Sequence, residues 1–271
     1  MPSVLAIGDT LVEVSMQVRD AWEESPDIQA ASCAVSAGGS AANFAAVVAA
    51  LGIESVLATD IGTDFFRQFL LDDLRRSAIS SALVREHSGR NSTCVITIGA
   101  DGERRFLSHR GAQGEGPSAD YLRRMLSDLA SRDWLHISGF WLQHPVTAEI
   151  VGRMALQAAS LGIPISLDPS PQIMETPNEF VDQVIDVADV LFPNAYEACT
   201  FTQTTEPGVA ACQLADRGVP TVIVTDGANG VHWATSEGVS TIEAPTVRAA
   251  DTTGAGDALA AGFVASRLFG N

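Results

Sequence analysis

Short apolar runs alternate with longer segments of helical periodicity along most of the chain. We predict strands at Val4–Ile7, Ser55–Ala58, Trp134–Ile137, Pro164–Leu167, Val190–Phe192 and Thr221–Val224. Helices are predicted over Ala41–Leu51, Asp64–Ala78, Thr147–Leu161, Glu179–Val187 and Pro207–Arg217. Gly52 follows the first of these helices, where a left-handed residue commonly ends a helix. Strands that alternate with helices are typical of a mainly parallel sheet with helices on both faces.

Two stretches break this alternation. Each contains a pair of strand-like segments with no helix between them: Leu11–Gln17 with Ser32–Ala37, and Asn91–Ile98 with Arg104–Leu107. The turn Ala100-Asp101-Gly102-Glu103 is a hairpin signal. We therefore expect a single domain over residues 1–271, in which about 11–37 and 91–108 contribute a small antiparallel lid. The glycine-rich segment Gly111–Pro117 is interpreted as a loop and not as a domain boundary.

The length and composition fit this interpretation. The chain has 271 residues, of which 46% are hydrophobic, enough for the core of one large α/β domain. No apolar run reaches the roughly 20 residues that a membrane helix needs. Met1–Ile7 lacks a basic region and is interpreted as a first strand, not a signal peptide. We expect a cytoplasmic protein with no membrane partner.

The formal net charge of −17 narrows the possible partners. The chain contains no lysine, so all 16 basic residues are arginine. This balance argues against a nucleic-acid surface, which needs a cationic patch. It also means that a bound phosphate must be met by backbone N–H groups, arginine or a metal ion.

The cysteines and histidines show no metal-binding spacing. Cys33, Cys94, Cys199 and Cys212 are scattered without a C-x-x-C pair, and we expect small buried hydrophobic side chains in a reducing compartment. The five histidines form no H-x-x-x-H or related pattern. A structural zinc site is therefore not expected.

The segment Arg248–Gly262, RAADTTGAGDALAAG, joins a glycine-rich turn to an alanine-rich helix. Unpaired N–H groups at a helix N-terminus bind anions. We expect the helix dipole to lower the pKa of Asp257, which could then accept a proton from a hydroxyl that attacks a phosphoryl group. The alternative is that Asp257 is only a charge at a helix start and the glycines only form a tight turn. A lysine-free chain excludes the P-loop.

A second segment near the start of the chain favours the interpretation of Asp257 as a catalytic residue. Gly38, Gly39, Asn43, Gly52 and Gly62 precede Asp251, Thr252, Gly254, Ala255, Gly256, Asp257 and Gly262 by about 200 residues. Together the two segments closely resemble the two signature motifs of the ribokinase-like (PfkB) carbohydrate kinases. The resemblance implies a three-layer α/β/α fold with a mainly parallel central sheet and a small β-sheet lid. It also implies ATP-dependent transfer of the γ-phosphate to a primary hydroxyl of a small carbohydrate.

The same resemblance assigns the catalytic and sugar-binding residues. Asp257 would be the general base, and the backbone of Gly254, Ala255 and Gly256 would form the anion hole. The sugar would contact Asp9, Glu13, Gly38, Gly39 and Asn43. The family usually has Asp where this chain has Glu13, which is one methylene longer.

Further positions resemble the nucleotide and metal sites of the family. Asn194 and Glu197 match an N-x-x-E element that supports Mg²⁺, often through water, although they could simply start a helix after Pro193. Thr225, Gly227 and Gly230 resemble a turn near the nucleotide. Asp251 and Thr253 resemble ligands of a monovalent cation such as K⁺.

Several positions leave alternatives open. Arg104 and Arg105 are either solvated lid residues or contacts to phosphate or substrate. Phe140 and Trp141 either wall the sugar pocket or pack in the core. Ser40 stands where ribokinases often carry lysine, which weakens an assignment to ribose.

Two further features of the sequence depart from the family. After Asp168 this chain lacks the arginine that many relatives carry. The sequence ends at Asn271, where relatives continue with elements that help to close the adenine pocket, so either a tail is missing or the nucleotide site is partly open. A nucleoside kinase and a non-catalytic sugar- or nucleotide-binding protein stay as alternatives. An exposed lid face suggests a homodimer.

Overall fold

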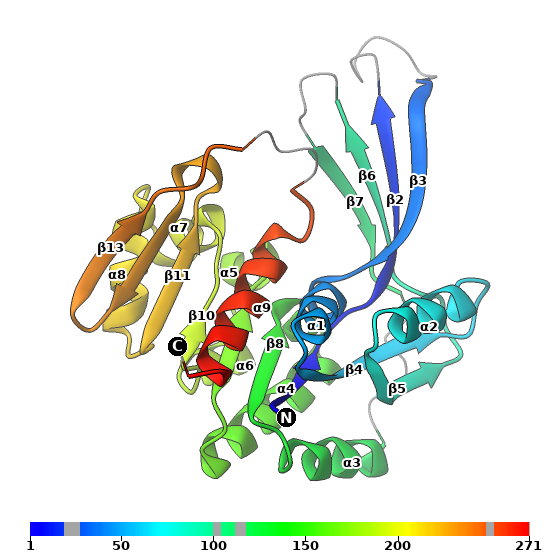
Figure 1. Ribbon diagram of the computed structural model, residues 1–271, viewed down its shortest axis with the longest axis horizontal. Helices are drawn as coiled ribbons and strands as arrows, with labels where there is room; N and C mark the ends of the chain where they lie inside the picture. Colours follow the sequence, from blue (N-terminus) through cyan, green and yellow to red (C-terminus); the bar gives the residue numbers. More distant parts are fainter. Residues whose placement is uncertain (19–27, 100–103, 112–117, 248–251, 271) are drawn as a thin grey trace.

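The computed structural model describes residues 1–18, 28–99, 104–111, 118–247 and 252–270. Within these residues, a nine-stranded sheet has the order β13-β12-β11-β10-β9-β8-β1-β4-β5 (Figure 1). Its strands are β1 (Ser3–Ile7), β4 (Glu54–Gly62), β5 (Ser80–His87), β8 (Trp134–Ser138), β9 (Ile165–Asp168), β10 (Val190–Leu191), β11 (Thr221–Thr225), β12 (Val231–Thr235) and β13 (Gly238–Ile242). The strands from β5 to β11 are parallel, and β12 and β13 add an antiparallel hairpin at one edge.

Helices cover both faces of this sheet. Val4 and Ala6 belong to one core cluster, which includes the helices α1 (Ser40–Ala50), α2 (Arg67–Arg76) and α9 (Ala255–Leu268). Leu5 and Ile7 belong to the opposite cluster. That cluster includes α3 (Ala119–Leu129), α4 (Pro145–Leu161), α6 (Glu179–Ile185), α7 (Ala195–Thr202) and α8 (Pro207–Asp216). The alternation along β1 sends successive side chains to opposite faces, and the three-layer α/β/α prediction is confirmed.

The lid is a separate four-stranded sheet that stands out from the body (Figure 1). Its order is β3-β2-β6-β7, with β2 (Leu11–Val18), β3 (Ala30–Gly38), β6 (Thr93–Ile98) and β7 (Arg104–His109). The pairs β2–β3 and β6–β7 are antiparallel, whereas β2 and β6 are parallel. The predicted all-antiparallel lid is therefore wrong in one pairing, because β2 and β6 leave the body in the same direction. The predicted turn at 100–103 lies outside the described residues.

Four parts of the fold are not among the predicted elements: β5, α3, the short helix α5 (Pro171–Glu175) and the β12–β13 hairpin. Every residue of β13 is exposed, so its sequence has no apolar run that would mark a strand. In α3 the buried side chains are Tyr121, Met125 and Leu129. Their spacing of four residues is a helical signal that could have identified the helix.

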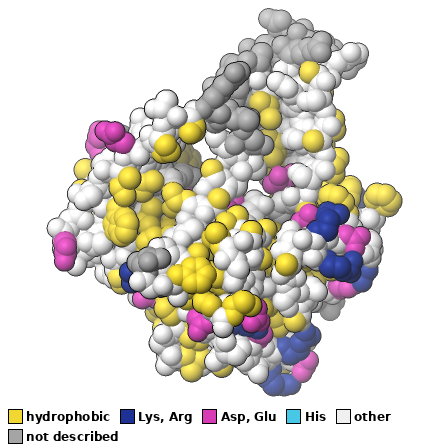
Figure 2. Space-filling view, in the orientation of Figure 1, with side chains coloured by type: hydrophobic (Ala, Val, Ile, Leu, Met, Phe, Trp, Pro, Cys, Tyr) yellow, Lys and Arg dark blue, Asp and Glu magenta, His cyan; other side chains and the backbone are white. Residues whose placement is uncertain are grey.

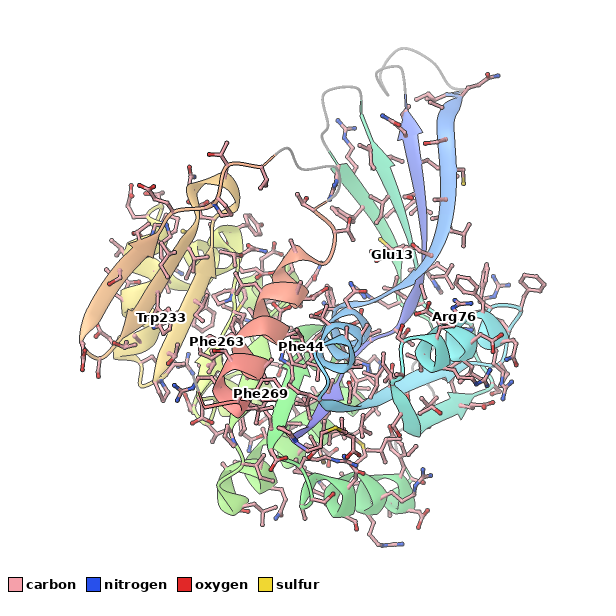
Figure 3. The ribbon with its side chains drawn as sticks, in the orientation of Figure 1. Glu13, Phe44, Arg76, Trp233, Phe263 and Phe269 are labelled. Atoms are coloured by element: carbon pink, nitrogen blue, oxygen red, sulfur yellow. The ribbon has the colours of Figure 1, made fainter. Side chains whose placement is uncertain are left out.

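Aromatic contacts fix the position of α9 against the sheet. The Phe263 ring lies 5.5 Å from Phe192 and 5.9 Å from Trp233, measured between ring centroids, and both contacts are edge-on (Figure 3). Ala260 and Ala261 are fully buried on the same helix. These small residues let α9 approach α1 closely, which sets the position of the glycine-rich turn at its start.

Three smaller findings complete the fold. Cys33 is exposed on the lid, so the expectation of four buried cysteines is wrong there, while Cys94 is buried and Cys199 and Cys212 are half-buried. None of the described helices combines the length and the apolar character needed to cross a membrane. Gly52 has φ of 82°, as its predicted place after the first helix requires.

Candidate active site

A cavity of about 580 Å³ lies between the lid and the carboxyl ends of the body strands. Open parallel sheets bind ligands at this edge. Most of the predicted site residues line it: Asp9, Glu13, Gly39, Asn43, Asn194, Glu197, Thr225, Thr253, Gly254, Gly256 and Asp257. Four predicted residues do not line the cavity, namely Gly38, Ala255, Gly227 and Gly230, and Asp251 lies outside the described residues. Segments more than 200 residues apart in sequence thus meet at one cavity.

One end of the cavity is built by the start of α9. Gly254 precedes this helix with φ of 74°, a left-handed conformation that other residues rarely adopt. Asp257 lies in the first turn and is 9% exposed. The Asn43 side-chain amide donates a hydrogen bond of 2.8 Å to Asp257 Oδ2. This contact joins α1 to α9 and holds the carboxylate at the helix start.

The electrostatics of Asp257 differ from the expectation. Its pKa is raised, not lowered, because burial penalises the charged form. Hydrogen bonds from Asn43 and Ser40 lower this pKa, and the nearby charge of Asp9 raises it further. The predicted lowering of the Asp257 pKa by the helix dipole is therefore wrong, because desolvation of the buried carboxylate outweighs the dipole.

Asp168, at the end of β9, is a neighbour of Asp257 that the predicted site set does not contain. Burial and the charges of Asp257 and Glu197 raise the pKa of Asp168 well above its usual value. The interaction between the two carboxyls raises the pKa of Asp168 and lowers that of Asp257, so the two groups titrate as a coupled pair. Ser40 Oγ also donates to Asp168 Oδ2, at 3.2 Å. A carboxylate that directly follows a body strand was the signal available in the sequence.

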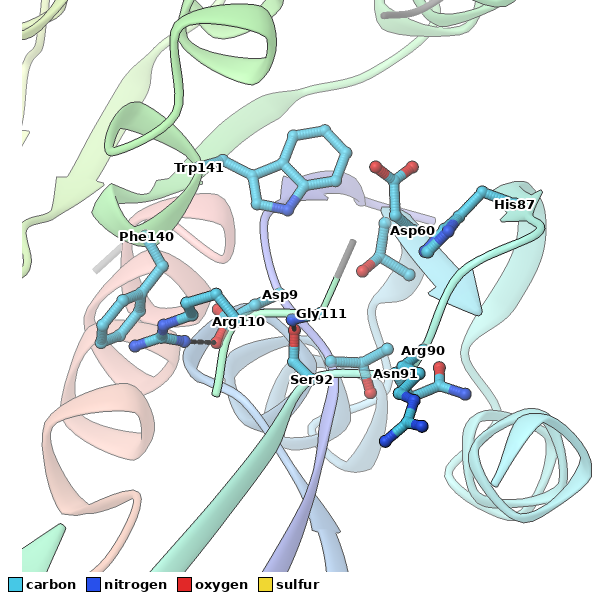
Figure 4. Close-up of a pocket in the computed structure, with 12 residues that line it drawn as sticks. Asp9, Asp60, His87, Arg90, Asn91, Ser92, Arg110, Gly111, Phe140 and Trp141 are labelled. Carbon is cyan, nitrogen blue, oxygen red and sulfur yellow. Dashed lines mark hydrogen bonds and ion pairs between the residues drawn. The ribbon is translucent and has the colours of Figure 1, made fainter. Parts of the chain in front are cut away.

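A further part of the cavity wall is built around Asp9. This side chain is buried, and burial raises its pKa above the usual value in spite of the nearby Arg110. Ser138 Oγ donates to Asp9 Oδ1 at 3.2 Å, and Arg110 Nη1 lies 3.4 Å from Asp9 Oδ2 (Figure 4). The Arg110 guanidinium stacks on Phe140, 3.9 Å from the ring centroid. Arg110 is thus a site residue that the sequence pattern did not identify.

The two aromatic residues after β8 have different surroundings. Phe140 lines the cavity, whereas Trp141 is 2% exposed and packs in the core. Of the two alternatives considered for this pair, a place in the cavity wall therefore holds for Phe140, and packing in the core holds for Trp141. Trp141 and Phe140 also border a small inner chamber next to Asp9 (Figure 4).

Gly39 and Gly38 permit close packing at the base of the lid. A Cβ atom on Gly39 would lie 2.6 Å from the backbone oxygen of Asp9, and this residue has φ of 105°. A Cβ atom on Gly38 would overlap the Glu13 carboxylate. Glu13 lies at the root of the lid (Figure 3). Gly38 therefore contributes space for the Glu13 side chain, although it does not itself line the cavity.

The comparison with protein families decides the assignment. The sequence model of the pfkB family of carbohydrate kinases matches this chain over residues 1–271. The chain belongs to this family. The protein is therefore an ATP-dependent carbohydrate kinase, a phosphotransferase whose acceptor is an alcohol group.

Curated relatives of this pfkB kinase match nearly the whole chain. The ATP-dependent ribose-1-phosphate kinase of Halopiger xanaduensis is 30% identical over 270 residues, covering 99% of this chain and 86% of the relative. The fructokinase of Vibrio alginolyticus is 29% identical over 274 residues, covering 98% and 84% of the two chains.

Solved structures show the same fold. Adenosine kinase from Sinorhizobium meliloti superposes with a TM-score of 0.85 at 23% identity, covering 100% of this chain and 88% of the other. Arabidopsis thaliana ribokinase, solved with ribose and ATP, has a TM-score of 0.81 at 21% identity, covering 100% and 87% of the two chains. At these identities the likeness concerns the fold alone.

Another part of the cavity wall begins at the N-terminus of α7. Asn194 and Glu197 form a capping box: the Asn194 side chain accepts a hydrogen bond of 2.9 Å from the Glu197 N–H, and Glu197 Oε2 accepts one of 2.9 Å from the Asn194 N–H. The two residues therefore start a helix and line the cavity as well. Burial raises the pKa of Glu197 to about 7.

The turn after β11 lies beside this helix. Thr225 bridges to Asn194 and lines the cavity, and Gly227–Asn229 form one turn of 3-10 helix. Gly230 has φ of 95°, and a Cβ atom there would overlap the Ile242 carbonyl oxygen. Gly230 is thus required by the packing of β13, and the turn directs Thr225 towards the cavity.

Proposed function

We propose that this kinase transfers the γ-phosphate of ATP to the primary hydroxyl of a small sugar, with Asp257 as general base. The observation that carries the proposal is the position of Asp257, beside Gly254 and in the same cavity wall as Asn43. A carboxylate at a helix N-terminus stands next to the N–H groups that bind anions. The base and the anion hole are therefore adjacent, as phosphoryl transfer requires.

The chemical step follows from this arrangement. The hydroxyl oxygen forms a bond to the γ-phosphorus while the bond from that phosphorus to the bridging oxygen breaks, and ADP leaves. The hydroxyl proton passes to the Asp257 carboxylate. The contact with Asp168 lowers the pKa of Asp257, which favours Asp257 as the carboxylate that accepts the proton. The backbone of Gly254, Ala255 and Gly256 stabilises the charge that develops on the phosphoryl oxygens.

The sugar is proposed to bind at the Asp9 end of the cavity. Asp9, Glu13 and Asn43 provide acceptors and donors for hydroxyl groups, and Gly39 keeps the backbone close to them. Arg110 adds donors from the lid side and lies flat on Phe140. This set matches an acceptor with several hydroxyl groups, and the Gly38 space allows Glu13 to take the place of the shorter Asp.

The nucleotide phosphates are proposed to lie between α9 and α7. Thr225, Gly227 and Gly230 would shape the turn beside them, with Asn194 and Glu197 opposite. Within the described residues, no group of three or more His, Cys, Asp or Glu side chains is arranged to hold a metal ion by itself. Mg²⁺ is typically held by one or two carboxylates together with substrate phosphates, and Glu197, through water, fits that role. When bound, Mg²⁺ would offset the charge of the phosphates.

Three further features belong to the proposal. Asp251 and Thr253 are assigned to a monovalent-cation site, tested by comparing turnover in K⁺ with turnover in a choline salt of equal ionic strength. A homodimer through the lid is supported by exposed apolar side chains there, such as Val35 and Leu107, at 53% and 75% exposure. Light scattering of the purified protein tests it. A cytoplasmic location is kept as an expectation and is tested by cell fractionation.

The central test is a coupled assay of ADP release over hexoses, pentoses, keto-deoxy sugars, sugar phosphates and nucleosides. Robust turnover with a sugar supports the proposal. Phosphorylation of adenosine or inosine, but of no sugar, would establish a nucleoside kinase, an activity suggested by the fold of the adenosine kinase neighbour. If no acceptor in the panel stimulates ADP release, the protein is a non-catalytic relative and the proposal is wrong.

A further inference from the structure

The small inner chamber adjoins the active-site cavity. Asp9, Arg110 and Phe140 border both spaces, so these three side chains are their shared wall (Figure 4). Beyond this wall the chamber is bordered by Thr59 and Asp60, two adjacent residues of β4. A ligand group that passes the shared wall therefore reaches side chains that the proposed mechanism does not use.

Thr59 contributes to the chamber a hydroxyl group that has no partner. The side chain is fully buried, and its Oγ1 makes no hydrogen bond to any part of the chain that the structure describes. A buried polar group costs free energy as long as its hydrogen bond is not made. A polar group that enters the chamber and bonds to Thr59 would remove this cost.

The chamber has room for one oxygen atom. Its volume is about 20 Å³, and a water molecule needs at least about 10–15 Å³ of such space, together with about two to four polar partners. Partners of this kind border the chamber, among them Thr59, Asp9 and His87. A carboxylate or a phosphate group is too large, since each carries more than one oxygen atom.

The carboxylates at the chamber are already paired with arginines. Arg85 donates two hydrogen bonds to Asp60, of 2.7 Å and 2.6 Å, and Arg110 Nη1 lies 3.4 Å from Asp9 Oδ2. Arg90 also borders the chamber, but its side chain is largely exposed to solvent. Because the buried charges offset one another in pairs, the chamber favours a neutral group over an ion.

We propose that the chamber binds the hydroxyl group at the end of the sugar farthest from the reacting hydroxyl, and that Thr59 determines this specificity. The inference rests on the proposed function, in which the sugar binds at Asp9. The bound hydroxyl accepts a hydrogen bond from Thr59 and donates one to Asp9. Sugars with a neutral hydroxyl at that end are therefore preferred to deoxy sugars, sugar acids and sugar phosphates.

The test removes the hydrogen bond from either side. Wild-type protein and Thr59→Val are assayed with D-fructose and 1-deoxy-D-fructose, and with D-ribose and 1,4-anhydro-D-ribitol. Each analogue lacks only the hydroxyl at the far end of its sugar. For the complete sugar, kcat/KM should fall by about 3–10-fold in Thr59→Val, the size expected for one neutral hydrogen bond. For the analogue, the two proteins should be equal, and Thr59→Ser, which keeps the hydroxyl, should resemble the wild type with both.

Ser55→Ala is the matched control. Ser55 lies near the start of the same strand and also has a buried hydroxyl without a hydrogen-bond partner among the described residues. It borders a groove away from the active site, together with residues such as Met1 and Ala78. This variant should have the kcat/KM of the wild type with every acceptor. Calorimetric titration of the sugars without ATP should show the same differences in Kd.

Two outcomes overturn this inference alone. Equal losses with a sugar and with its analogue would show that Thr59 only supports the wall. A wild-type protein that phosphorylates sugar acids or sugar phosphates, but no neutral sugar, would contradict the preference and leave the proposed function standing. If the acceptor panel identifies another neutral sugar, the same comparison uses that sugar and its deoxy analogue. A protein that phosphorylates only nucleosides, or no acceptor at all, overturns the proposed function and this inference with it.

Discussion

The two walls of the cavity are built in different ways. The body wall holds carboxylates that are nearly enclosed: Asp9, Glu197 and Asp257 are 8%, 4% and 9% exposed. The lid wall is open, with Phe106 at 60% exposure. Burial shifts the pKa of a carboxylate, and hydrogen bonds then hold its side chain in one position. An exposed side chain can adopt more conformations. The comparison indicates that the body provides the base and that the lid provides contacts which form and break around it.

The surface charge follows the same division. Arginines and carboxylates gather over α2 and α3, while the lid shows far fewer charged side chains on the same face (Figure 2). The pairs over α2 include Arg75 with Asp72 and Arg76 with Asp73, and these side chains are largely exposed. Exposed pairs of this kind contribute little to stability. The body is therefore held by its large core, and the lid by strand pairing and by a small buried cluster of Leu11, Cys94 and Ile96.

Asp257→Asn should produce the largest change on the body wall. The amide can still accept the Asn43 hydrogen bond, so the fold is kept, but it cannot take the proton. General-base catalysis is typically worth about 10²–10⁴-fold, and kcat should fall on that scale. The matched variant Asp9→Asn should instead act mainly on the KM of the sugar. Steady-state kinetics with near-normal turnover for Asp257→Asn would contradict the assignment of the base.

Gly254→Val should damage both stability and turnover. Gly254 has φ of 74°, and a Cβ atom there would lie 3.4 Å from Asn43 Nδ2. A left-handed conformation costs other residues about 1–2 kcal/mol, and the valine side chain also fills the anion hole. Gly262→Ala on the same helix is the control, since a Cβ atom there meets nothing within 4 Å. Denaturant unfolding with equal losses in the two variants would show that the turn has no special requirement.

Glu197→Gln should reveal a pH dependence of stability that is specific to the body wall. The pKa of Glu197 is about 7 in the folded protein, above its ordinary value of 4.5. The folded state therefore retains this proton over a range where the unfolded state has lost it, so the contribution is greatest below pH 4.5 and is lost as the pH rises to about 7. The unfolding free energy of Glu197→Gln, relative to wild type, should rise by up to about 1.4 kcal/mol per pH unit in that window.

This measurement needs nucleotide-free protein, because ligands at the cavity would change the titration. The difference between the two proteins cancels contributions common to both, such as that of the buried His136, whose pKa burial lowers to about 3. A difference that stays constant between pH 4.5 and 7 would show that Glu197 is not buried as described.

Leu107→Ala on the lid should have the smallest effect. Leu107 is 75% exposed, and a surface substitution usually changes stability by no more than about 0.5 kcal/mol. The matched body variant Leu70→Ala removes a fully buried side chain and should cost about 2–5 kcal/mol. Denaturant unfolding at low protein concentration compares them without a contribution from association. Similar losses in the two variants would show that Leu107 is not the exposed residue described here.

The body of the fold was predictable because each of its strands and helices carries its own hydrophobic pattern. Val4–Ile7 and its neighbours are apolar runs of strand length. The helix α8 begins at Pro207 as predicted, and α4 begins at Pro145, two residues before its predicted start. The β12–β13 hairpin and β5 were not predictable in this way, since edge strands bury few side chains. The parallel pairing of β2 with β6 was missed because pairing direction depends on where each strand leaves the body.

The sequence by itself determined the family, the alternation of strands and helices in the body and many of the residues at the cavity, because motif residues are local and their spacing can be read directly from the chain. The tertiary structure decided how these residues interact. Burial, which no local sequence pattern reveals, reversed the expected pKa change of Asp257. The packing of β9 and α9 brought Asp168 close to it. Strand pairing placed Arg104 and Arg110 in the wall of one cavity. Such effects depend on distances between residues far apart in sequence, and only folding sets those distances.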